Sequence, residues 1–592
     1  MTPDEAPRLL TDSQYAAGSA PAVEVLEAES KAFPLDQYWS HAWPRVVLVL
    51  IILICAGIRF HLRNTPLDRD EGEYAYAGQL LLQGVPPYKL AYNMKLPGTY
   101  AGYAVILAIF GQTPAGIHLG VLIVNAATIL LIYLLTVRLF DQLAGLAAAA
   151  TYGLLSVGAG VLGFVGHATH FVVLPAVAGI LLLLKGMESR RVGLLFWSGV
   201  LLGAFVMKQP GIFFACFGEA YLLACEWKKK ANFLEVGRQL TIFSLGVVAP
   251  FALTCLLMLK AGVFSKFWFW TFSYAEQYAT INPASTGLHT FRKMLHVVMD
   301  RSQALWAFAG LGMIALLWNR KARAHAGFLA GFLFFSSLSI CPGLYFRRHY
   351  FILLLPVVAV LAGLGLSSAY ELLSQPERKR WLRWIPVFVF LFALQYCMRR
   401  QRKFLFQLDP VALSNAVYPT DPFALAPEIA AYLRQHTGKT EKIAVLGSEP
   451  EIFFYSHRRS ATGYIYVYSL MEEQAYALAM QKEAIGEIEA ARPKYVVYVY
   501  ASYSWALQPH SQLLFLSWAQ RYVRQGYELA GVADVKSGIC LWNDEVRSYE
   551  LESPWTVYVY RRREIEPASD ESQHQPPGAN TTGNLHELPR FW

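Results

Sequence analysis

Between residues 44 and 398 the chain carries apolar runs that are long enough, or nearly long enough, to cross a lipid bilayer. We place eleven of them, at residues 44–60, 117–137, 143–161, 168–186, 192–207, 211–227, 239–263, 303–319, 325–341, 350–368 and 382–398. No soluble domain needs that much apolar surface, and a mean hydropathy of +0.32 agrees. The sequence therefore predicts a polytopic α-helical membrane protein.

The basic residues between these runs predict the orientation of the chain. The run Tyr100–Phe110 is short, and glycines and a proline follow it, so we interpret it as a re-entrant or interfacial helix. With that choice, nearly every short basic cluster falls on one side, as the positive-inside rule requires for the cytoplasm; these clusters are Arg138 and residues 188–191, 228–230, 319–323 and 378–380. The N-terminus is then cytoplasmic, and residues 61–100, 264–302 and everything after 400 lie outside.

Charge and cysteine content narrow the class further. The net charge of +9 is explained by cytoplasmic loops, so a nucleic-acid partner is not expected. The seven cysteines show no metal-ligand spacing and no disulfide pattern. Residues 1–43 are polar and acidic and lack the pattern of a cleavable signal peptide, so we expect a disordered cytoplasmic segment followed by an uncleaved signal-anchor in the cytoplasmic (inner) membrane.

The chain changes character after residue 400. Residues 441–448, 464–468, 494–500 and 555–560 carry strand signals, while residues 471–492 and 517–525 have helical spacing. We therefore expect a transmembrane domain over 44–400 and an extracytoplasmic α/β domain over 401–562. Residues 563–592 are rich in Pro, Ser and acidic residues, which predicts a disordered tail.

The acidic cluster Asp68, Asp70, Glu71 and Glu73 directly follows the first apolar run. A carboxylate beside a low-dielectric wall can act as a general base, and Asp70 is the best single candidate. A solvated loop is the alternative. Residues 73–83 have a helical pattern, so Asp70 would also suit a helix cap.

Several basic and imidazole side chains are predicted on the same outer face. Lys95 stands in a turn before Pro97, where its compact charge suits a phosphate oxygen or snorkels at the interface. Lys208 interrupts two apolar runs and could also reach a phosphate. The segment Arg347–Tyr350 lies on the side that basic clusters avoid, which indicates anion binding or an ion pair with the acidic loop.

Two further features have weaker functional meaning. His167 and His170 share one helical face, a possible metal spacing, but the sequence offers no third ligand and supports no metal site. The loop 264–302 is rich in Phe, Trp and Tyr, which predicts an interfacial aromatic belt or, alternatively, stacking on sugar rings or contact with a lipid tail.

The stretch LDRDEGEYAYAGQLLLQGVPPY, followed by NMKLPGTYAGY, resembles the first outer loop of the type C membrane glycosyltransferases. The likeness is greatest to bacterial members related to protein O-mannosyltransferases and lipid A aminoarabinose transferases, and it covers most of residues 40–400. In those families an acidic pair and a juxtamembrane helix precede a Lys-Pro turn; Asp70-Glu71 and Lys95-Leu96-Pro97 match. Leu96 and the motif His167-Ala-Thr-His170 depart from the pattern, the latter replacing an acidic residue.

The resemblance implies inverting transfer of a sugar from a polyprenyl-phosphate donor to a protein, lipid or glycan acceptor at the outer face. The expected catalytic residues are Asp70 as general base, with Glu71 and Asp68. The residues expected to bind the donor phosphate are Lys95, Lys208, Arg347 and Arg348. Those expected to contact substrate are His167, His170, His349 and Tyr350.

Two other functions remain open from the sequence. A transporter or lipid flippase would use the same charges as a substrate path, but the chain shows no internal repeat. A membrane-anchored binding protein would need far fewer spans.

Overall fold

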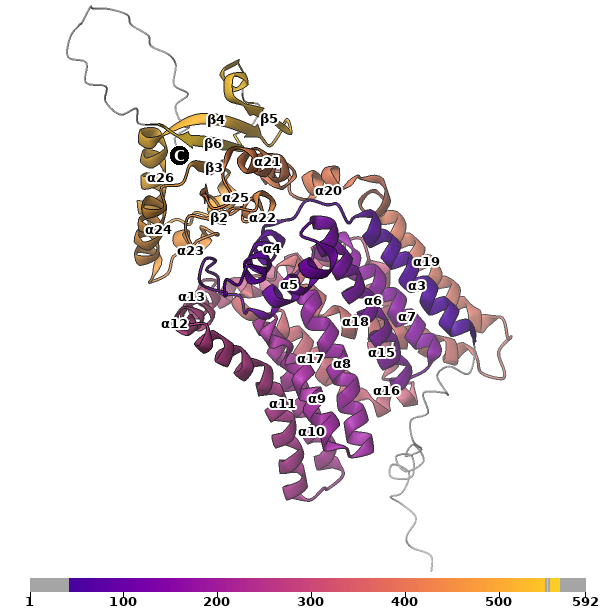
Figure 1. Cartoon of the computed structure of the whole chain (residues 1–592). Helices are drawn as coiled ribbons and strands as arrows, with labels where there is room; N and C mark the ends of the chain where they lie inside the picture. The colour runs from indigo at the N-terminus through magenta and orange to yellow at the C-terminus, as the bar shows by residue number, and fades with distance from the viewer. Residues whose placement is uncertain (1–41, 549–550, 552–553, 565–592) are drawn as a thin grey trace, which may run out of the picture.

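The computed structural model describes residues 42–548, 551 and 554–564 (Figure 1). The predicted N-terminal segment 1–43 and the predicted tail 563–592 lie almost entirely outside these residues.

Each of the eleven predicted apolar runs contains a helix. These helices are α3 (Ala42–His61), α6 (Pro114–Leu139), α7 (Gln142–Val157), α8 (Ala168–Ser189), α9 (Val192–Leu202), α10 (Ile212–Lys228), α11 (Phe233–Lys260), α15 (Gln303–Ala315), α17 (Ala326–Ser339), α18 (Leu355–Leu373) and α19 (Ile385–Arg400). Six stretches are long and apolar enough to cross a membrane by length and composition: α3, α6, α8, α11, α18 and Leu382–Arg400, which includes α19. The number of spans and the orientation stay predictions.

The run predicted to be re-entrant or interfacial forms α5 (Gly98–Phe110). Thirteen residues make a helix of about 20 Å, shorter than the hydrocarbon core of about 30 Å. It packs against α4 (Arg69–Leu82) at the end of the bundle that carries the C-terminal domain (Figure 1).

Helix α4 begins within the predicted acidic cluster, but its cap is not the residue that the sequence suggested. Asp68, not Asp70, is the N-cap, and its side chain accepts a hydrogen bond from the Glu71 backbone N–H. Asp70 and Glu71 occupy the first turn, where negative charge favours the helix dipole. The helix ends before Gly84, whose positive φ of 75° suits glycine.

The C-terminal domain is built on a six-stranded mixed sheet with the order β2-β1-β3-β6-β4-β5. Its strands are β1 (Lys442–Leu446), β2 (Arg459–Ser460), β3 (Tyr495–Tyr500), β4 (Tyr527–Asp534), β5 (Ile539–Trp542) and β6 (Thr556–Arg562). β1 pairs with β2 and β3 in parallel, and the other pairs are antiparallel. The central strand β3 is buried along most of its length because helices cover both faces of the sheet.

The two faces of β3 pack against different partners. Val496 and Tyr498 share a core with α24 (Ala477–Ala491) and α26 (Leu514–Gly526). Val497 and Val499 belong to a core that includes α21 (Ala426–His436), α22 (Glu451–Ser456) and the juxtamembrane helices α4 and α5. The C-terminal domain is therefore joined to the helical bundle through a shared hydrophobic core.

Helices α4 and α22 approach closely at Gly72. A Cβ atom at position 72 would lie 2.6 Å from the backbone nitrogen of Glu451 and 2.7 Å from its Cβ. Because the obstacle includes backbone, only glycine permits this contact.

The predicted strands at 441–448, 494–500 and 555–560 are confirmed as β1, β3 and β6, and the predicted helices as α24 and α26. The predicted strand at 464–468 is wrong. Residues 464–467 are irregular and Tyr468 begins the short helix α23 (Tyr468–Met471). The run is apolar and aromatic because it is buried between the two domains. The Val467 backbone N–H donates to the Ser448 hydroxyl instead of to a neighbouring strand. β2, β4 and β5 were not expected.

Candidate active site

A cavity of about 400 Å³ lies where the helical bundle meets the C-terminal domain. Its walls come from the start of α4, the loop that leads to α5, the start of α8, the segment after α9, the segment before α18 and the C-terminal domain. The aromatic loop 264–302, which begins with α12 (Phe264–Trp268), adds residues from the π-helical η4 (Phe269–Tyr274) and from α13 (Ala275–Thr280). Nine of the eleven predicted site residues line this cavity; Glu71 and His170 do not.

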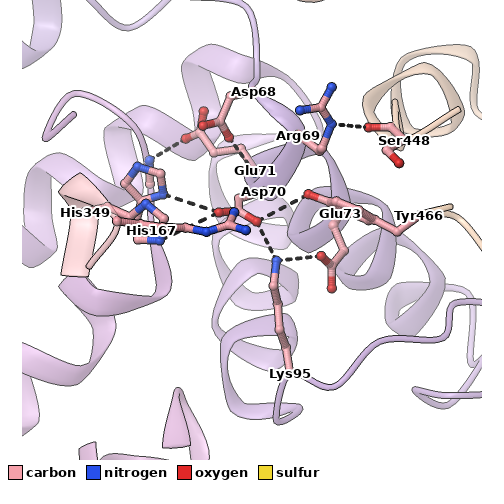
Figure 2. A network of polar contacts seen from close by, with 12 residues as sticks. Asp68, Arg69, Asp70, Glu71, Glu73, Lys95, His167, His349, Ser448 and Tyr466 are labelled. Atoms are coloured by element: carbon pink, nitrogen blue, oxygen red, sulfur yellow. Dashed lines mark hydrogen bonds and ion pairs between the residues drawn. The ribbon is translucent and has the colours of Figure 1, made fainter. Parts of the chain in front are cut away.

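Asp70 lies at the centre of the polar network in Figure 2. Its Oδ1 is 2.6 Å from the Lys95 ammonium and accepts a hydrogen bond from the Tyr466 hydroxyl at 3.3 Å. Its Oδ2 is 4.0 Å from Nδ1 of His167 and 3.9 Å from Nε2 of His349. Burial would raise the pKa of Asp70, but the charge of Lys95, helped by the two histidines, holds that pKa well below its usual range. Asp70 is therefore ionised at neutral pH.

Lys95 is shared between two carboxylates. Its Nζ also lies 2.6 Å from Oε2 of Glu73, a buried residue whose Oε1 accepts a hydrogen bond from Tyr100. Burial alone would lower the pKa of Lys95, but the charges of Asp70 and Glu73 keep it well above its usual value. Lys95 is thus a cation with two of its three N–H donors engaged by protein carboxylates.

Asp68 and Glu71 flank Asp70 but have different surroundings. Asp68 lines the cavity, caps α4 and accepts a hydrogen bond from Tyr418 at 2.9 Å. Burial, with the charges of Glu71 and Asp70, raises the pKa of Asp68 to about 7. Glu71 faces the bundle instead: its Oε1 lies 3.0 Å from His118 on α6 and accepts the Gly166 N–H at 2.5 Å. The two residues hold α4 from both sides.

Lys208 and Arg347 line the cavity and make no ion pair with a carboxylate among residues 42–548. The Lys208 ammonium is 4.3 Å from the ring centroid of Tyr350, and Arg347 donates to the Tyr278 hydroxyl at 3.4 Å. Burial, despite the nearby charge of Asp70, lowers the pKa of Lys208 to about 7.

Arg348 also borders the cavity, but its guanidinium is used elsewhere. Its Nε donates to the Gly160 carbonyl at 3.1 Å, and its Nη2 donates to the Ala159 carbonyl. Arg348 therefore fastens the segment before α18 to the turn before α8.

The two histidines whose spacing allows metal binding, His167 and His170, do not both face the cavity. His167 is the N-cap residue of α8 and lines the cavity, where its ring stacks on that of His349 at 4.1 Å between centroids. His170 is buried away from the cavity. Tertiary packing instead brings Asp70, His167 and His349 together, with one ligand atom of each within 4.8 Å of the others. Two imidazoles and a carboxylate are suitable ligands for a divalent transition metal, and the ring nitrogens of His167 are buried without a hydrogen bond among the described residues.

The chain is similar to known proteins in part of its sequence and in its fold. A family model described as dolichyl-phosphate-mannose-protein mannosyltransferase matches residues 97–253. ArnT from Cupriavidus metallidurans, bound to undecaprenyl phosphate, superposes with a TM-score of 0.52 at 14% identity over 87% of this chain and 97% of that one. The archaeal oligosaccharyltransferase AglB from Archaeoglobus fulgidus, in complex with an inhibitory peptide and a dolichol-phosphate, gives a TM-score of 0.50 at 14% identity over 87% and 76%. The fold is that of a type C membrane glycosyltransferase.

The resemblance inferred from the sequence is thereby confirmed. Among curated protein sequences no significant match was found. In this chain the cavity lies at the junction of the juxtamembrane helices and the C-terminal domain, and that domain supplies part of the wall.

The contribution of the C-terminal domain was missed from the sequence. Arg69, the residue between Asp68 and Asp70, donates to the Ser448 carbonyl at 2.6 Å (Figure 2). It also pairs with Asp421 and Glu449 at 2.8 and 2.9 Å. From the same domain, Tyr466, Tyr468 and Glu472 enter the cavity. The dense aromatic run 464–468 was the available signal, but it was taken for a strand.

Proposed function

We propose that this protein transfers a sugar from a polyprenyl-phosphate donor to an acceptor, with inversion at the anomeric carbon. The observation that carries the proposal is that one cavity holds an ionised carboxylate, Asp70, together with two basic side chains, Lys208 and Arg347, that form no ion pair with a carboxylate in the described part of the chain. A base and an anion site facing one space are what displacement of a phosphate leaving group requires.

The polyprenyl phosphate is supported by the two solved structures. ArnT is bound to undecaprenyl phosphate and AglB to a dolichol-phosphate, and this chain shares their fold. In this protein Lys208 and Arg347 would bind the phosphate oxygens, and the apolar helices beside the cavity would contact the lipid.

In the proposed reaction the acceptor hydroxyl approaches the anomeric carbon from the side of Asp70. The bond between the acceptor oxygen and the anomeric carbon forms while the bond to the phosphate oxygen breaks. The electron pair of that bond stays on the phosphate, which Lys208 and Arg347 stabilise, and the hydroxyl proton passes to Asp70. A carboxylate whose pKa is low is a weak base, so Asp70 takes the proton late, when bond formation has made the hydroxyl acidic.

Lys95 takes a different role from the phosphate contact expected from the sequence. Two carboxylates at 2.6 Å already hold its ammonium, so it keeps Asp70 ionised and oriented. Glu71, turned toward His118, is a positioning residue for α4, and Arg348 positions the segment that carries Arg347.

We place the reaction at the outer face of the cytoplasmic (inner) membrane, as the basic loops predict. The acceptor is a protein, a lipid or a glycan, and the cavity geometry favours none of them.

The test is transfer by purified protein in proteoliposomes, using a panel of radiolabelled polyprenyl-phosphate hexoses, pentoses and N-acetylhexosamines with membrane extract as acceptor. Wild type is expected to transfer label from at least one donor. Asp70→Asn should abolish transfer while donor still binds, whereas Lys208→Met combined with Arg347→Met should weaken donor binding itself.

Asp300→Asn is the matched control, because Asp300 is an exposed carboxylate outside the cavity. Full transfer by Asp70→Asn would refute the base assignment. Movement of an intact lipid-linked sugar across sealed vesicles, without transfer, would replace the enzyme by the transporter or flippase considered from the sequence.

A further inference from the structure

One acidic side chain in the cavity is not used by the proposed reaction. Glu472 follows α23 in the C-terminal domain and lines the cavity with only 7% of its surface exposed. It differs from Asp68 and Asp70 because it comes from the domain rather than from α4.

Glu472 is fixed by a residue of the aromatic loop. The Tyr274 hydroxyl, at the end of the π-helical η4, donates to Oε2 of Glu472. The other carboxylate oxygen, Oε1, accepts no hydrogen bond from the described residues and is not fully enclosed by protein. A carboxylate has about four acceptor positions, so Glu472 keeps free capacity toward the cavity.

The contacts of loop 264–302 place Glu472 on the same wall as Arg347. Tyr274, which donates to Glu472, and Tyr278, which accepts a hydrogen bond from Arg347, are four residues apart on the consecutive helical segments η4 and α13. Burial raises the pKa of Glu472 above its usual value, and the hydrogen bond from Tyr274 and the charge of Arg347 offset this only in part. Glu472 therefore lines the cavity beside a cation that is proposed to bind the phosphate.

Aromatic rings surround this end of the cavity. The Trp270 ring contacts that of Tyr274 at 5.0 Å and that of Tyr92 at 5.9 Å between centroids, and all three residues line the cavity. Apolar ring faces beside a carboxylate are suited to a sugar, which presents C–H groups on its faces and hydroxyl donors at its edge.

We propose that Glu472, held by Tyr274, binds the transferred sugar of the donor and selects sugars that offer hydrogen-bond donors over sugars that carry a carboxylate. The inference rests on the proposed function, because the sugar is the group attached directly to the phosphate at Arg347. Like charge in a desolvated site is an effective means of rejecting an otherwise similar ligand, so a uronic acid is the disfavoured class.

The experiment compares matched donors that differ in one group. Polyprenyl-phosphate glucose, galactose and mannose are each paired with the corresponding uronic acid, and kcat/KM for transfer is measured in proteoliposomes. The wild type is expected to prefer the neutral member of the pair it uses. Glu472→Gln keeps the shape and removes the charge, so the neutral-to-acidic ratio should fall by at least about tenfold.

The matched control is Glu473→Gln. Glu473 is the adjacent residue, exposed, and its carboxylate accepts a hydrogen bond from the His510 N–H outside the cavity. This variant should leave the ratio unchanged. Tyr274→Phe, which retains the ring, should shift the ratio in the same direction as Glu472→Gln but by less.

The outcomes separate the two levels of the proposal. Transfer by the wild type with an unchanged ratio in Glu472→Gln, in protein of unchanged thermal stability, would overturn the sugar assignment and leave the proposed function intact. A wild type that transfers from no donor, including the wider panel above, would overturn both.

Discussion

The reduced pKa of Lys208 makes a quantitative prediction about how donor binding depends on pH. Burial holds this pKa at about 7, so the lysine is cationic below pH 7 and neutral above it. A phosphodiester donor keeps one negative charge throughout this range. Donor affinity should therefore be greatest below pH 7 and decline as the pH rises through the pKa of the empty site.

The size of the effect follows from the titration. If the charged lysine alone binds phosphate, the apparent Kd is proportional to 1 + 10^(pH − pKa), which gives about a tenfold increase between pH 6 and pH 8. Arginine stays charged at all these pH values, so Lys208→Arg should abolish most of that increase. Binding above pH 7 should also take up a proton in the wild type, because the bound phosphate stabilises the cationic lysine.

The assay is equilibrium binding of a polyprenyl-phosphate sugar to protein in detergent at several pH values, with calorimetry in buffers of different ionisation enthalpy to count protons. Asp68 needs a control because burial raises its pKa to about 7, so it titrates in the same pH range and its ionisation would also weaken donor binding as the pH rises. Asp68→Asn removes that contribution and keeps a good helix cap. The proteins to compare are Asp68→Asn alone and Asp68→Asn combined with Lys208→Arg. If donor affinity depends on pH in the same way in both, Lys208 does not bind the phosphate.

Two further variants test the support of Asp70 and of its helix. Lys95→Met should raise the pKa of Asp70 and move the acidic limb of the pH profile of kcat to higher pH by about one unit or more. The control is Lys89→Met, because Lys89 is an exposed lysine of the same loop, and it should leave the limb in place. An unmoved limb in Lys95→Met would mean that Asp70 is not the titrating group. Gly72→Ala should force α4 away from α22 and lower the free energy of unfolding by about 1–3 kcal/mol, with loss of transfer. Gly57→Ala, which meets no atom within 4 Å, should change neither quantity, and equal thermal stability of the two variants would contradict the packing argument.

Local sequence was sufficient for the helices and for the approximate location of the site. Apolar composition is a property of each segment alone, so all eleven runs contain helices, and the short run at 100–110 has a helix too short to span. The acidic cluster predicted a helix start, and it is one, although Asp68 rather than Asp70 provides the cap. Nine predicted site residues converge on one cavity because they lie at the same ends of neighbouring helices.

Pairing among those residues could not be predicted, because it depends on distances between parts of the chain that are far apart in sequence. Spacing along one helix suggested His167 with His170, but packing of the segment before α18 brings His349 against His167 and Asp70 instead. The run 464–468 alternates like a strand only because two domains bury it from both sides.

The roles of the charges also depend on tertiary contacts. Lys95, 25 residues from Asp70, forms an ion pair with it, while Lys208 and Arg347 form no ion pair with a carboxylate within residues 42–548. Lys95 forms ion pairs with carboxylates and Lys208 does not, because of the neighbours that each side chain meets in three dimensions. The cost of burying a charge depends on partners within a few ångströms and not on the adjacent residues in sequence.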